Sequence, residues 1–465
     1  MSANVAAPGA LVTLVPRKRR GAEALLLFLA LVLGVGSYAL VGLGVDGEVP
    51  TDLISYGGGL VVLAVISHIV VRLRAPYADP VILPAAVALN GIGLAMIYRI
   101  DLARLENDPD ASTFAAQQLL WTAISVACFV ATLVLVRDHR RLQAFTYTMG
   151  LTGLVLLLLP LLPVIGLEVN GARIWISLAG FSFQPGEIAK ICLAIFFAGY
   201  LVLKRDALAL AGRRFLGVDL PRGRDLGPIL VMWLVSLGVL VFERDLGSSL
   251  LFFGLFVVLL YVATERPSWL IVGGALFAAG AYFGYLAFGH VQTRVDGWLD
   301  PFSDYDRYYQ IIQGQYSLAW GGMLGRGWGR GSPEITPYSW TDFIATSLGE
   351  ELGLTGLMAI VLIYALIVER GFRIALVCKD PFGKLLAIGL TMALALQIFV
   401  VVGGVTNLIP LTGLTTPLLS YGGSSLIANW ILVALLLRIS HHARRPPPDL
   451  RPPSADDETQ VVTLR

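Results

Sequence analysis

Side chains that could do chemistry sit in four short stretches of an otherwise apolar chain. The first is NGARIWISLAGFSFQPGEIAK at 170–190, where Glu187 and Lys190 lie three residues apart near the predicted start of a helix. This spacing puts both side chains on one helix face. The pair is consistent with a structural ion pair, and also with a polar cavity wall formed together with Arg173 and Gln184.

The second stretch, ERDLGSSL at 243–250, places Asp245 just before Gly247 at the predicted start of a membrane span. Helix capping alone would explain an acid at this position, because a carboxylate accepts the free N–H groups of the first helical turn. Asp245 is therefore a candidate site residue, with a plain helix cap as the alternative.

The third stretch, ITPYSWTDFIATSLGEELG at 335–353, places Asp342 where a long loop re-enters the membrane. An apolar boundary disfavours the charged form of a carboxyl group, which suits a general base when a cation or a hydrogen bond offsets the cost. The alternative for Asp342 is again an N-cap. Glu350 and Glu351 follow about two turns deeper, where capping cannot explain them.

The same loop contains GRGWGRG at 325–331. No strand precedes it, so it is not a nucleotide-binding loop. Arg326 and Arg330 among glycines are compatible with a phosphate cradle made of backbone N–H groups. They are equally compatible with a merely flexible loop.

The fourth stretch is NLIPLTGLTTPLLSYGGSS at 407–425, between the last two apolar runs. Its two prolines, its hydroxyl residues and the pair Gly422 and Gly423 predict non-helical backbone at the membrane face. Such backbone is tolerated only where protein covers it or where it lines a wet cavity. This stretch is therefore expected to belong to a site.

The elements that must position these groups are membrane helices. Only 14% of the residues are charged and 56% are hydrophobic, with a mean hydropathy of +0.74, whereas soluble chains carry roughly a quarter of charged residues. Apolar runs of membrane-spanning length occur at about 23–44, 53–71, 80–98, 115–136, 142–163, 187–203, 227–242, 248–263, 268–288, 344–368, 382–403 and 423–438. The chain therefore predicts an all-α, polytopic transmembrane bundle of about twelve helices.

Charge along the loops predicts the orientation of the bundle. Lys and Arg are frequent at 17–20, 72–79, 137–141, 204–226 and 369–381, whereas 46–52 and 106–112 are acidic. By the positive-inside rule both termini are cytoplasmic, and the largest outside loop is 289–343. The tail at 441–465 is rich in proline and charge, which predicts disorder.

Cysteine and histidine are not predicted to bind a metal. Cys128, Cys192 and Cys378 show neither a disulfide framework nor a metal-ligand spacing. The five histidines form no HExxH-like pattern, and His441 and His442 flank the end of a predicted helix.

Taken in order, the motifs resemble those of the SEDS proteins (shape, elongation, division and sporulation), the RodA/FtsW group of bacterial peptidoglycan polymerases. The matching motifs are NGA…W…FQPGE..K, DLG at 245–247, WTDFI…GEELG at 340–353 and PLTGLTTPLLSYGGSS at 410–425. The resemblance implies a cytoplasmic tail at 1–22, two additional transmembrane helices at 23–78 and a SEDS core at 79–440. Length and tail favour the RodA branch.

Two positions depart from the family pattern. Ile174 stands where the family commonly has Arg directly before the Trp of the first motif, and Arg173 precedes it. The usual QPSE is QPGE here, so Gly186 offers no hydroxyl group.

The resemblance implies polymerisation of lipid II outside the membrane. The 4-hydroxyl group of the acceptor GlcNAc attacks C1 of the donor MurNAc, and undecaprenyl diphosphate leaves with inversion at C1. This reaction needs a base, positive charge for the diphosphate and an apolar groove for the polyprenyl chains.

The resemblance also implies the residues that do this. Asp342 is the expected base, Lys190 and Arg294 are expected to contact the diphosphate, and Glu187 and Asp245 would orient them or hold a divalent cation. The full set of expected substrate-binding residues is Arg173, Trp175, Gln184, Glu187, Lys190, Asp245, Arg294, Gln310, Thr341, Ser420, Tyr421 and Ser424.

The expected partners are lipid II, the membrane and a class B penicillin-binding protein, and no nucleic acid. The resemblance allows Mg²⁺ or Mn²⁺ and implies no organic cofactor. The expected location is the bacterial cell membrane, which the chain would cross several times. Two alternatives are a lipid II flippase, which predicts polar residues at mid-bilayer, and a scaffold that only recruits the penicillin-binding protein.

Overall fold

The protein is a bundle of membrane-length helices. The computed structural model describes residues 18–446 except 170–171, 179–180, 210–212, 216–217, 221–226, 228–230, 232, 236 and 239–241. Within these residues, 11 helices are long and apolar enough to cross a membrane. The predicted polytopic helical fold is therefore confirmed. Half of the predicted span at 227–242 and the whole tail from residue 447 lie outside the described residues.

The eleven candidate spans agree closely with the apolar runs. They are α1 (Arg20–Val45), α2 (Leu53–Arg74), α3 (Ile82–Asn107), α4 (Ala115–Leu135), α5 (Thr146–Leu158) with the flanking 3-10 turns η1 (His139–Phe145) and η2 (Leu159–Leu161), α6 (Pro185–Ala209), α8 (Leu246–Thr264), α9 (Ser268–Ala287), α12 (Ile344–Val377), α13 (Pro381–Val405) and α14 (Gly423–Arg444).

Shorter elements cover one end of the bundle, including much of the predicted loop at 289–343. These are α10 (Gly289–Leu299), η3 (Pro301–Ser303), α11 (Tyr309–Gly321) and η4 (Pro333–Ile335). Two β elements were not predicted. One is an antiparallel sheet of β1 (Gly166–Val169), β2 (Ala172–Leu178) and β3 (Phe181–Phe183), and the other is a hairpin of β4 (Arg213–Phe215) and β5 (Val218–Leu220). Both are too short to give a hydropathy signal.

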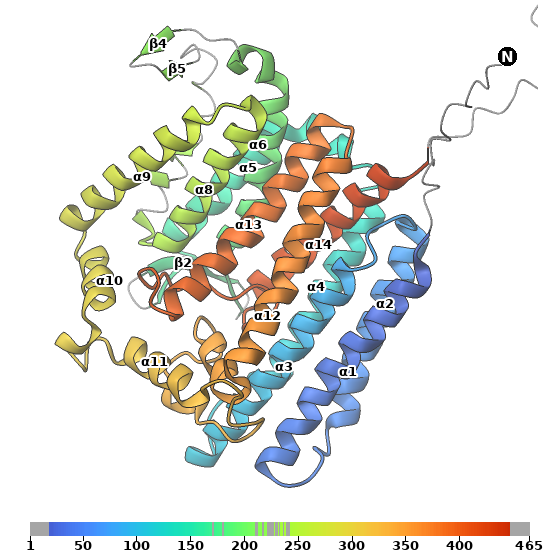
Figure 1. The fold of residues 1–465 in the computed structure, drawn as a ribbon, viewed down its shortest axis with the longest axis vertical. Coiled ribbons are helices and arrows are strands. Elements are labelled where there is room, and N and C mark those ends of the chain that lie inside the picture. Colours follow the sequence, from blue (N-terminus) through green and yellow to red (C-terminus); the bar gives the residue numbers. More distant parts are fainter. Residues whose placement is uncertain are drawn as a thin grey trace, which may run out of the picture.

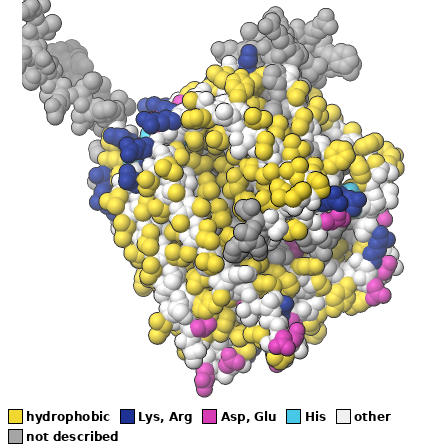
Figure 2. Space-filling model, turned by 180° about the vertical axis from the view of Figure 1, so that it is seen from behind, with side chains coloured by type: hydrophobic (Ala, Val, Ile, Leu, Met, Phe, Trp, Pro, Cys, Tyr) yellow, Lys and Arg dark blue, Asp and Glu magenta, His cyan; other side chains and the backbone are white. Residues whose placement is uncertain are grey.

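Burial separates central helices from lipid-facing ones. In the most apolar 18-residue stretch of each helix, 94% of the residues of α3 and 83% of those of α14 are buried, whereas only 6% of those of α9 are. Figure 1 accordingly shows α9 at one edge of the molecule and α1 and α2 at the other. Figure 2 shows the apolar surface that this leaves, with Lys and Arg concentrated at the upper left and Asp and Glu along the lower edge.

The amino-terminal pair of helices packs on the rest of the bundle, α1 mainly on α3 and α2 mainly on α4. A Cβ atom at Gly34 of α1 would lie 2.9 Å from the Cα atom of Gly91 of α3, so the two backbones touch. Tyr38 stacks on Tyr56 of α2 and on Tyr98 of α3, with ring centroids 5.3 and 4.2 Å apart. The two helices are thus an integral part of the bundle.

The glycine-rich loop at 325–331 is anchored by buried acids. Glu351 pairs with Arg99 of α3 at 2.8 Å, and its carboxylate accepts the backbone N–H groups of Gly329 and Gly331 at 3.0 and 3.3 Å. Because these N–H groups bind a carboxylate of the protein, the hypothesis of a phosphate cradle is wrong. This pairing also accounts for Glu351, an acid that helix capping could not explain.

Two breaks in helical geometry shape the end of the bundle that α10 and α11 cover. The backbone at Gly353 has φ +71°, which interrupts α12 about two and a half turns after its start at Ile344. Between α13 and α14 the chain is non-helical from Thr406 to Gly422, as predicted. These breaks let several loops converge at the end where α4, α12 and α14 begin.

Candidate functional site

A cavity of about 670 Å³ lies at this end of the bundle. Its wall comes from β2, α10, α11, the segment before α12, the non-helical segment between α13 and α14, and the starts of α4, α8 and α14. Predicted site residues in the lining are Trp175, Gln184, Asp245, Arg294, Gln310, Thr341, Asp342 and Tyr421. Four sequence motifs far apart along the chain therefore meet in one cavity.

Asp342 is held by its neighbours on both sides. The hydroxyl group of Thr341 donates to Oδ1 of Asp342 at 3.0 Å. The Ser420 hydroxyl group donates to the carbonyl oxygen of Thr341, and the Tyr421 N–H group donates to the carbonyl oxygen of Trp340 at 2.8 Å. The non-helical segment thus fixes the backbone that carries the carboxyl group.

Asp342 is not a helix cap. The N-cap residue of α12 is Phe343, and no side chain caps that helix. The carboxyl group instead faces the cavity. Desolvation raises the pKa of Asp342 to about 6, against the lowering effect of the Thr341 hydroxyl group and of the Arg294 charge.

Arg294 brings a cation to the same cavity from α10. Its Nη1 donates to the carbonyl oxygens of Leu411 and Thr412, at 3.2 and 2.8 Å. The guanidinium group is also attracted by the charges of Asp245 and Asp342. Its position is therefore set by the non-helical segment on one side and by two acids on the other.

Asp245 has two roles. Its Oδ1 accepts the N–H group of Ser248 at 2.9 Å, so the predicted cap of α8 is confirmed. The same side chain lines the cavity. Capping fixes one carboxylate oxygen, and the residue still contributes negative charge opposite Arg294.

Glu187 and Lys190 form a buried ion pair beneath the cavity. Nζ of Lys190 lies 2.5 Å from Oε2 of Glu187 and 2.7 Å from Oε1 of Gln397, and the Gln397 amide donates to the carbonyl oxygen of Thr415 at 3.0 Å. Neither charged residue lines the large cavity; both line a separate one of about 10 Å³. Through Gln397, the pair is connected to the backbone of the non-helical segment and helps to hold it in place.

Three other predicted residues lie outside the lining. Arg173 on β2 is exposed and pairs with Glu168 on β1 at 2.8 Å. Ser420 is buried behind Thr341, and Ser424 is buried where its hydroxyl oxygen accepts the Gln184 N–H group at 3.0 Å. Asn170 and Gly171 of the first motif lie outside the described residues.

Several lining residues were missed by sequence reasoning. Arg244 and Arg307 add two guanidinium groups to the wall, next to aromatic and amide side chains from Gln117, Trp121, Tyr308, Tyr338 and Trp340. Gln117 and Trp121 are four residues apart at the start of α4, a spacing that could have indicated one cavity-facing helix side. Arg307 stands in a polar loop with no periodicity to mark it.

Known proteins show the same organisation. Residues 81–445 match the family model of FtsW, RodA and SpoVE, which is described as a cell cycle protein. The chain is 51% identical over 448 residues to the peptidoglycan glycosyltransferase RodA of Mycobacterium tuberculosis, covering 96% of this chain and 95% of the relative. It is 34% identical to a probable peptidoglycan glycosyltransferase FtsW of Geobacter metallireducens, covering 79% of this chain and 96% of the relative.

A solved structure is similar as well. It comes from work on the structural coordination of polymerization and crosslinking by a peptidoglycan synthase complex. The matched chain has a TM-score of 0.61 and 28% sequence identity, covering 79% of this chain and 98% of that one.

The structural role of Lys190 generates a prediction on stability. Replacing Lys190 by Met should leave the Glu187 carboxylate, 5% exposed, without its cation, and breaking a buried pair from one side costs about 3–5 kcal/mol. The matched control Arg173→Met removes a pair whose side chains are 56% and 47% exposed, which should cost about 0–1 kcal/mol. Thermal unfolding in one detergent compares the two; equal melting temperatures would contradict the structural role.

Proposed function

The chain belongs to the FtsW/RodA/SpoVE family of cell cycle proteins, and from this premise we infer that it polymerises lipid II in the cavity around Asp342. It is a peptidoglycan glycosyltransferase, the activity named for its RodA and FtsW relatives. It is also a multi-pass protein of the bacterial membrane. The observation that carries the site assignment is a cavity that holds an ionisable carboxyl group and three guanidinium groups at one end of an apolar bundle.

The reaction joins two lipid-linked sugars. The 4-hydroxyl oxygen of the acceptor GlcNAc forms a bond with C1 of the donor MurNAc on the face opposite the diphosphate. The bond from C1 to the diphosphate oxygen breaks, and undecaprenyl diphosphate leaves with both bonding electrons. The proton of the acceptor hydroxyl group passes to Asp342.

Asp342 suits this role because of where it lies. A carboxyl group with a pKa of about 6 is ionised at neutral pH and is a stronger base than an ordinary aspartate, whose pKa is about 3.9. Its contact with Thr341 fixes the carboxylate in the cavity. Orientation of the base before the substrate arrives lowers the entropic part of the barrier.

The diphosphate is received by arginine side chains. Arg294, Arg244 and Arg307 line the same cavity. Guanidinium groups bind phosphate oxygens through paired hydrogen bonds, and they stabilise the negative charge that accumulates on the leaving group. Lys190 supports this wall indirectly, through Gln397 and Thr415.

A divalent cation such as Mg²⁺ or Mn²⁺ fits the carboxylates of the cavity. Asp245 would hold it, since one of its carboxylate oxygens caps α8 while the side chain lines the cavity, and Asp342 stays available to accept the proton. Such an ion takes few protein carboxylates together with substrate phosphates, and it would supply positive charge to the leaving diphosphate. Glu187 does not fit, because it is paired with Lys190.

Orientation and partner follow from the same proposal. Lys and Arg gather at one end of the molecule (Figure 2), and the cavity lies at the other, where α4, α8 and α14 begin. By the positive-inside rule the cavity end faces outward, where the reaction takes place. A transpeptidase, a class B penicillin-binding protein, would then crosslink the emerging strand, in line with the synthase complex that contains the similar chain.

The proposal predicts the effect of replacing the base. Asp342→Asn keeps an acceptor for the Thr341 hydroxyl group but cannot take a proton, so the variant should fold and make no glycan chains, with a loss of at least about 100-fold. Polymerisation of labelled lipid II by the purified protein measures this. The control Asp306→Asn changes an exposed acid outside the cavity and should retain activity. Full polymerisation by Asp342→Asn would remove Asp342 from the mechanism.

The proposal also predicts the pH dependence. The base form of Asp342 exists above its raised pKa, so activity should fall as the pH drops through about 6. Arg294→Gln removes a charge that lowers this pKa, and the acid limb should therefore move to higher pH. Arg307→Gln alters a cavity cation that is not among the main influences on this pKa, so it should reduce the rate and move the limb much less than Arg294→Gln does. An acid limb near pH 4, or one unmoved by Arg294→Gln, would contradict this assignment of the base.

A further inference from the structure

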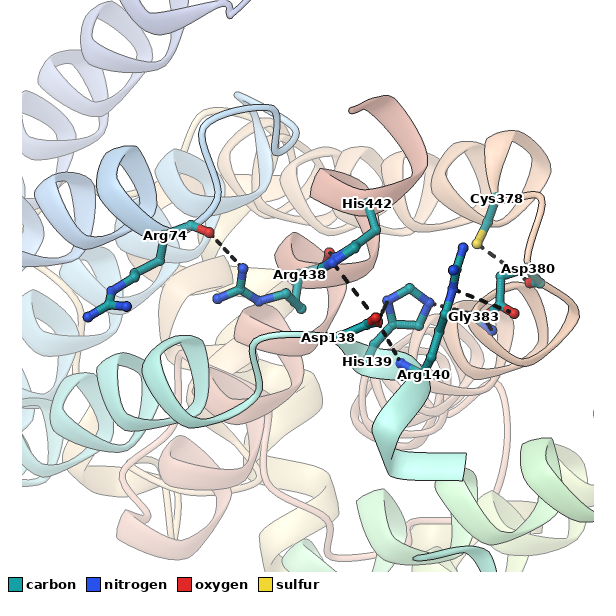
Figure 3. A network of polar contacts seen from close by, with 9 residues as sticks. All are labelled: Arg74, Asp138, His139, Arg140, Cys378, Asp380, Gly383, Arg438 and His442. Atoms are coloured by element: carbon teal, nitrogen blue, oxygen red, sulfur yellow. Dashed lines mark hydrogen bonds and ion pairs between the residues drawn. The ribbon is translucent and has the colours of Figure 1, made fainter. Parts of the chain in front are cut away.

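A second group of chemically active side chains lies at the far end of the bundle from the cavity, where α4 and α14 end. Asp138 is the N-cap residue of η1, His139 is the first residue of η1, and His442 is in the last turn of α14 (Figure 3). Oδ1 of Asp138 lies 3.7 Å from Nδ1 of His139 and 3.9 Å from Nε2 of His442. One ligand atom from each residue lies within 4.8 Å of the other two.

The other nitrogen of each imidazole ring has a hydrogen-bond partner that can only accept. Nε2 of His139 lies 3.2 Å from Oδ2 of Asp380, and Nδ1 of His442 lies 3.0 Å from the carbonyl oxygen of Arg438. Each of these nitrogens therefore carries the proton in the neutral ring. Nδ1 of His139 and Nε2 of His442 are left with free lone pairs beside Asp138.

His139 is fully buried, and its Nδ1 has no hydrogen-bond partner among the described residues. A buried polar atom without a partner is costly and calls for an explanation, such as an ion that the atom binds. Asp138 stands 3.7 Å away, too far for a hydrogen bond and on the side where a shared ion would sit.

We propose that Asp138, His139 and His442 bind a divalent transition-metal ion of the Zn²⁺ class. Two imidazole nitrogens and a carboxylate oxygen are ordinary ligands for such an ion, with water in the remaining position. Ligand atoms around tetrahedral Zn²⁺ are roughly 3.3 Å apart, so each distance from Asp138 must shorten by about half an ångström, and the distance between the two imidazole nitrogens, which is within 4.8 Å, by at most about 1.5 Å. The side chains of Asp138 and His442 are 37% and 20% exposed and can make this movement.

Contacts around the three ligands match those of metal sites. A metal-bound histidine commonly donates its second ring N–H group to a carboxylate or a carbonyl oxygen, which fixes the ring. Asp380 does this for His139, and the Arg438 carbonyl group does it for His442. The nearby cation of Arg438 is occupied elsewhere, because it donates to the carbonyl oxygens of Arg74 and Leu133.

The bound ion would join elements that are otherwise only packed together. It would link η1, between α4 and α5, to the last turn of α14. Through His139 the link would extend to Asp380, whose carboxylate caps α13 by accepting the Gly383 N–H group at 2.8 Å. The site lies at the end opposite the cavity, so it is a structural or regulatory site and not part of the glycosyl transfer.

Metal binding by the full-length protein in detergent tests the proposal. After removal of metal with a chelator, calorimetry with Zn²⁺ should show one saturable site per chain. Co²⁺ should give the visible absorption of a four-coordinate complex. Zn²⁺ should also raise the melting temperature.

Two ligand variants and one control make the test specific. His442→Ala removes a partly exposed ligand, and Asp138→Asn keeps the acceptor for the Arg140 N–H group while removing the charge. Each should weaken Zn²⁺ binding by at least about tenfold and abolish the melting-temperature shift. His290→Ala, outside the cluster, should bind as the parent does. Absence of saturable binding, or equal binding by the parent and both ligand variants, would overturn the proposal.

Discussion

The non-helical segment between α13 and α14 depends on one constraint, which is that backbone groups at the membrane face need partners. Its carbonyl groups at Leu411 and Thr412 accept from Arg294, and that of Thr415 accepts from Gln397. Gln397 in turn is held by Lys190. One of the side chains that satisfy this backbone, Arg294, is itself part of the cavity wall, whereas Gln397 and Lys190 lie behind that wall. Losing one of them would disturb both the fold and the site.

Charges in this chain divide into two kinds according to their partners. Buried pairs such as Glu187 with Lys190 and Arg99 with Glu351 hold elements together. Asp342, in contrast, accepts a hydrogen bond from one neutral hydroxyl group, and the positive charge of Arg294 acts on it only across the cavity. A carboxyl group left partly uncompensated in this way is the one that can exchange a proton. The distinction separates Asp342, the candidate base, from the paired acids Glu187 and Glu351.

Hydropathy predicted the helices, because apolar length acts locally along the chain. The cost of placing ions in a membrane marked Asp342 and Asp245 as candidate site residues, whereas the role of Arg294 was expected only from the family resemblance. The lining role of Arg307 could not be predicted, and the sequence left open whether Lys190 belongs to a structural ion pair or to the wall of the cavity, since both depend on the folded positions of the side chains. For the same reason the glycine-rich loop was misread, as its acceptor, Glu351, lies on another element. Asp138, His139 and His442 show no metal-ligand spacing in the sequence, because His442 lies far along the chain from the other two.

The central claim is that the diphosphate of a lipid-linked sugar binds in the cavity between Asp342 and Arg294. A cryo-electron microscopy structure of the Asp342→Asn variant with lipid II bound tests it most directly, because the variant should hold the substrate without turning it over. We expect density for the diphosphate against Arg294, with the sugar beside residue 342 and the polyprenyl chain leaving toward the apolar surface. Density for the diphosphate at another surface, with the cavity holding no substrate, would rule out this binding site.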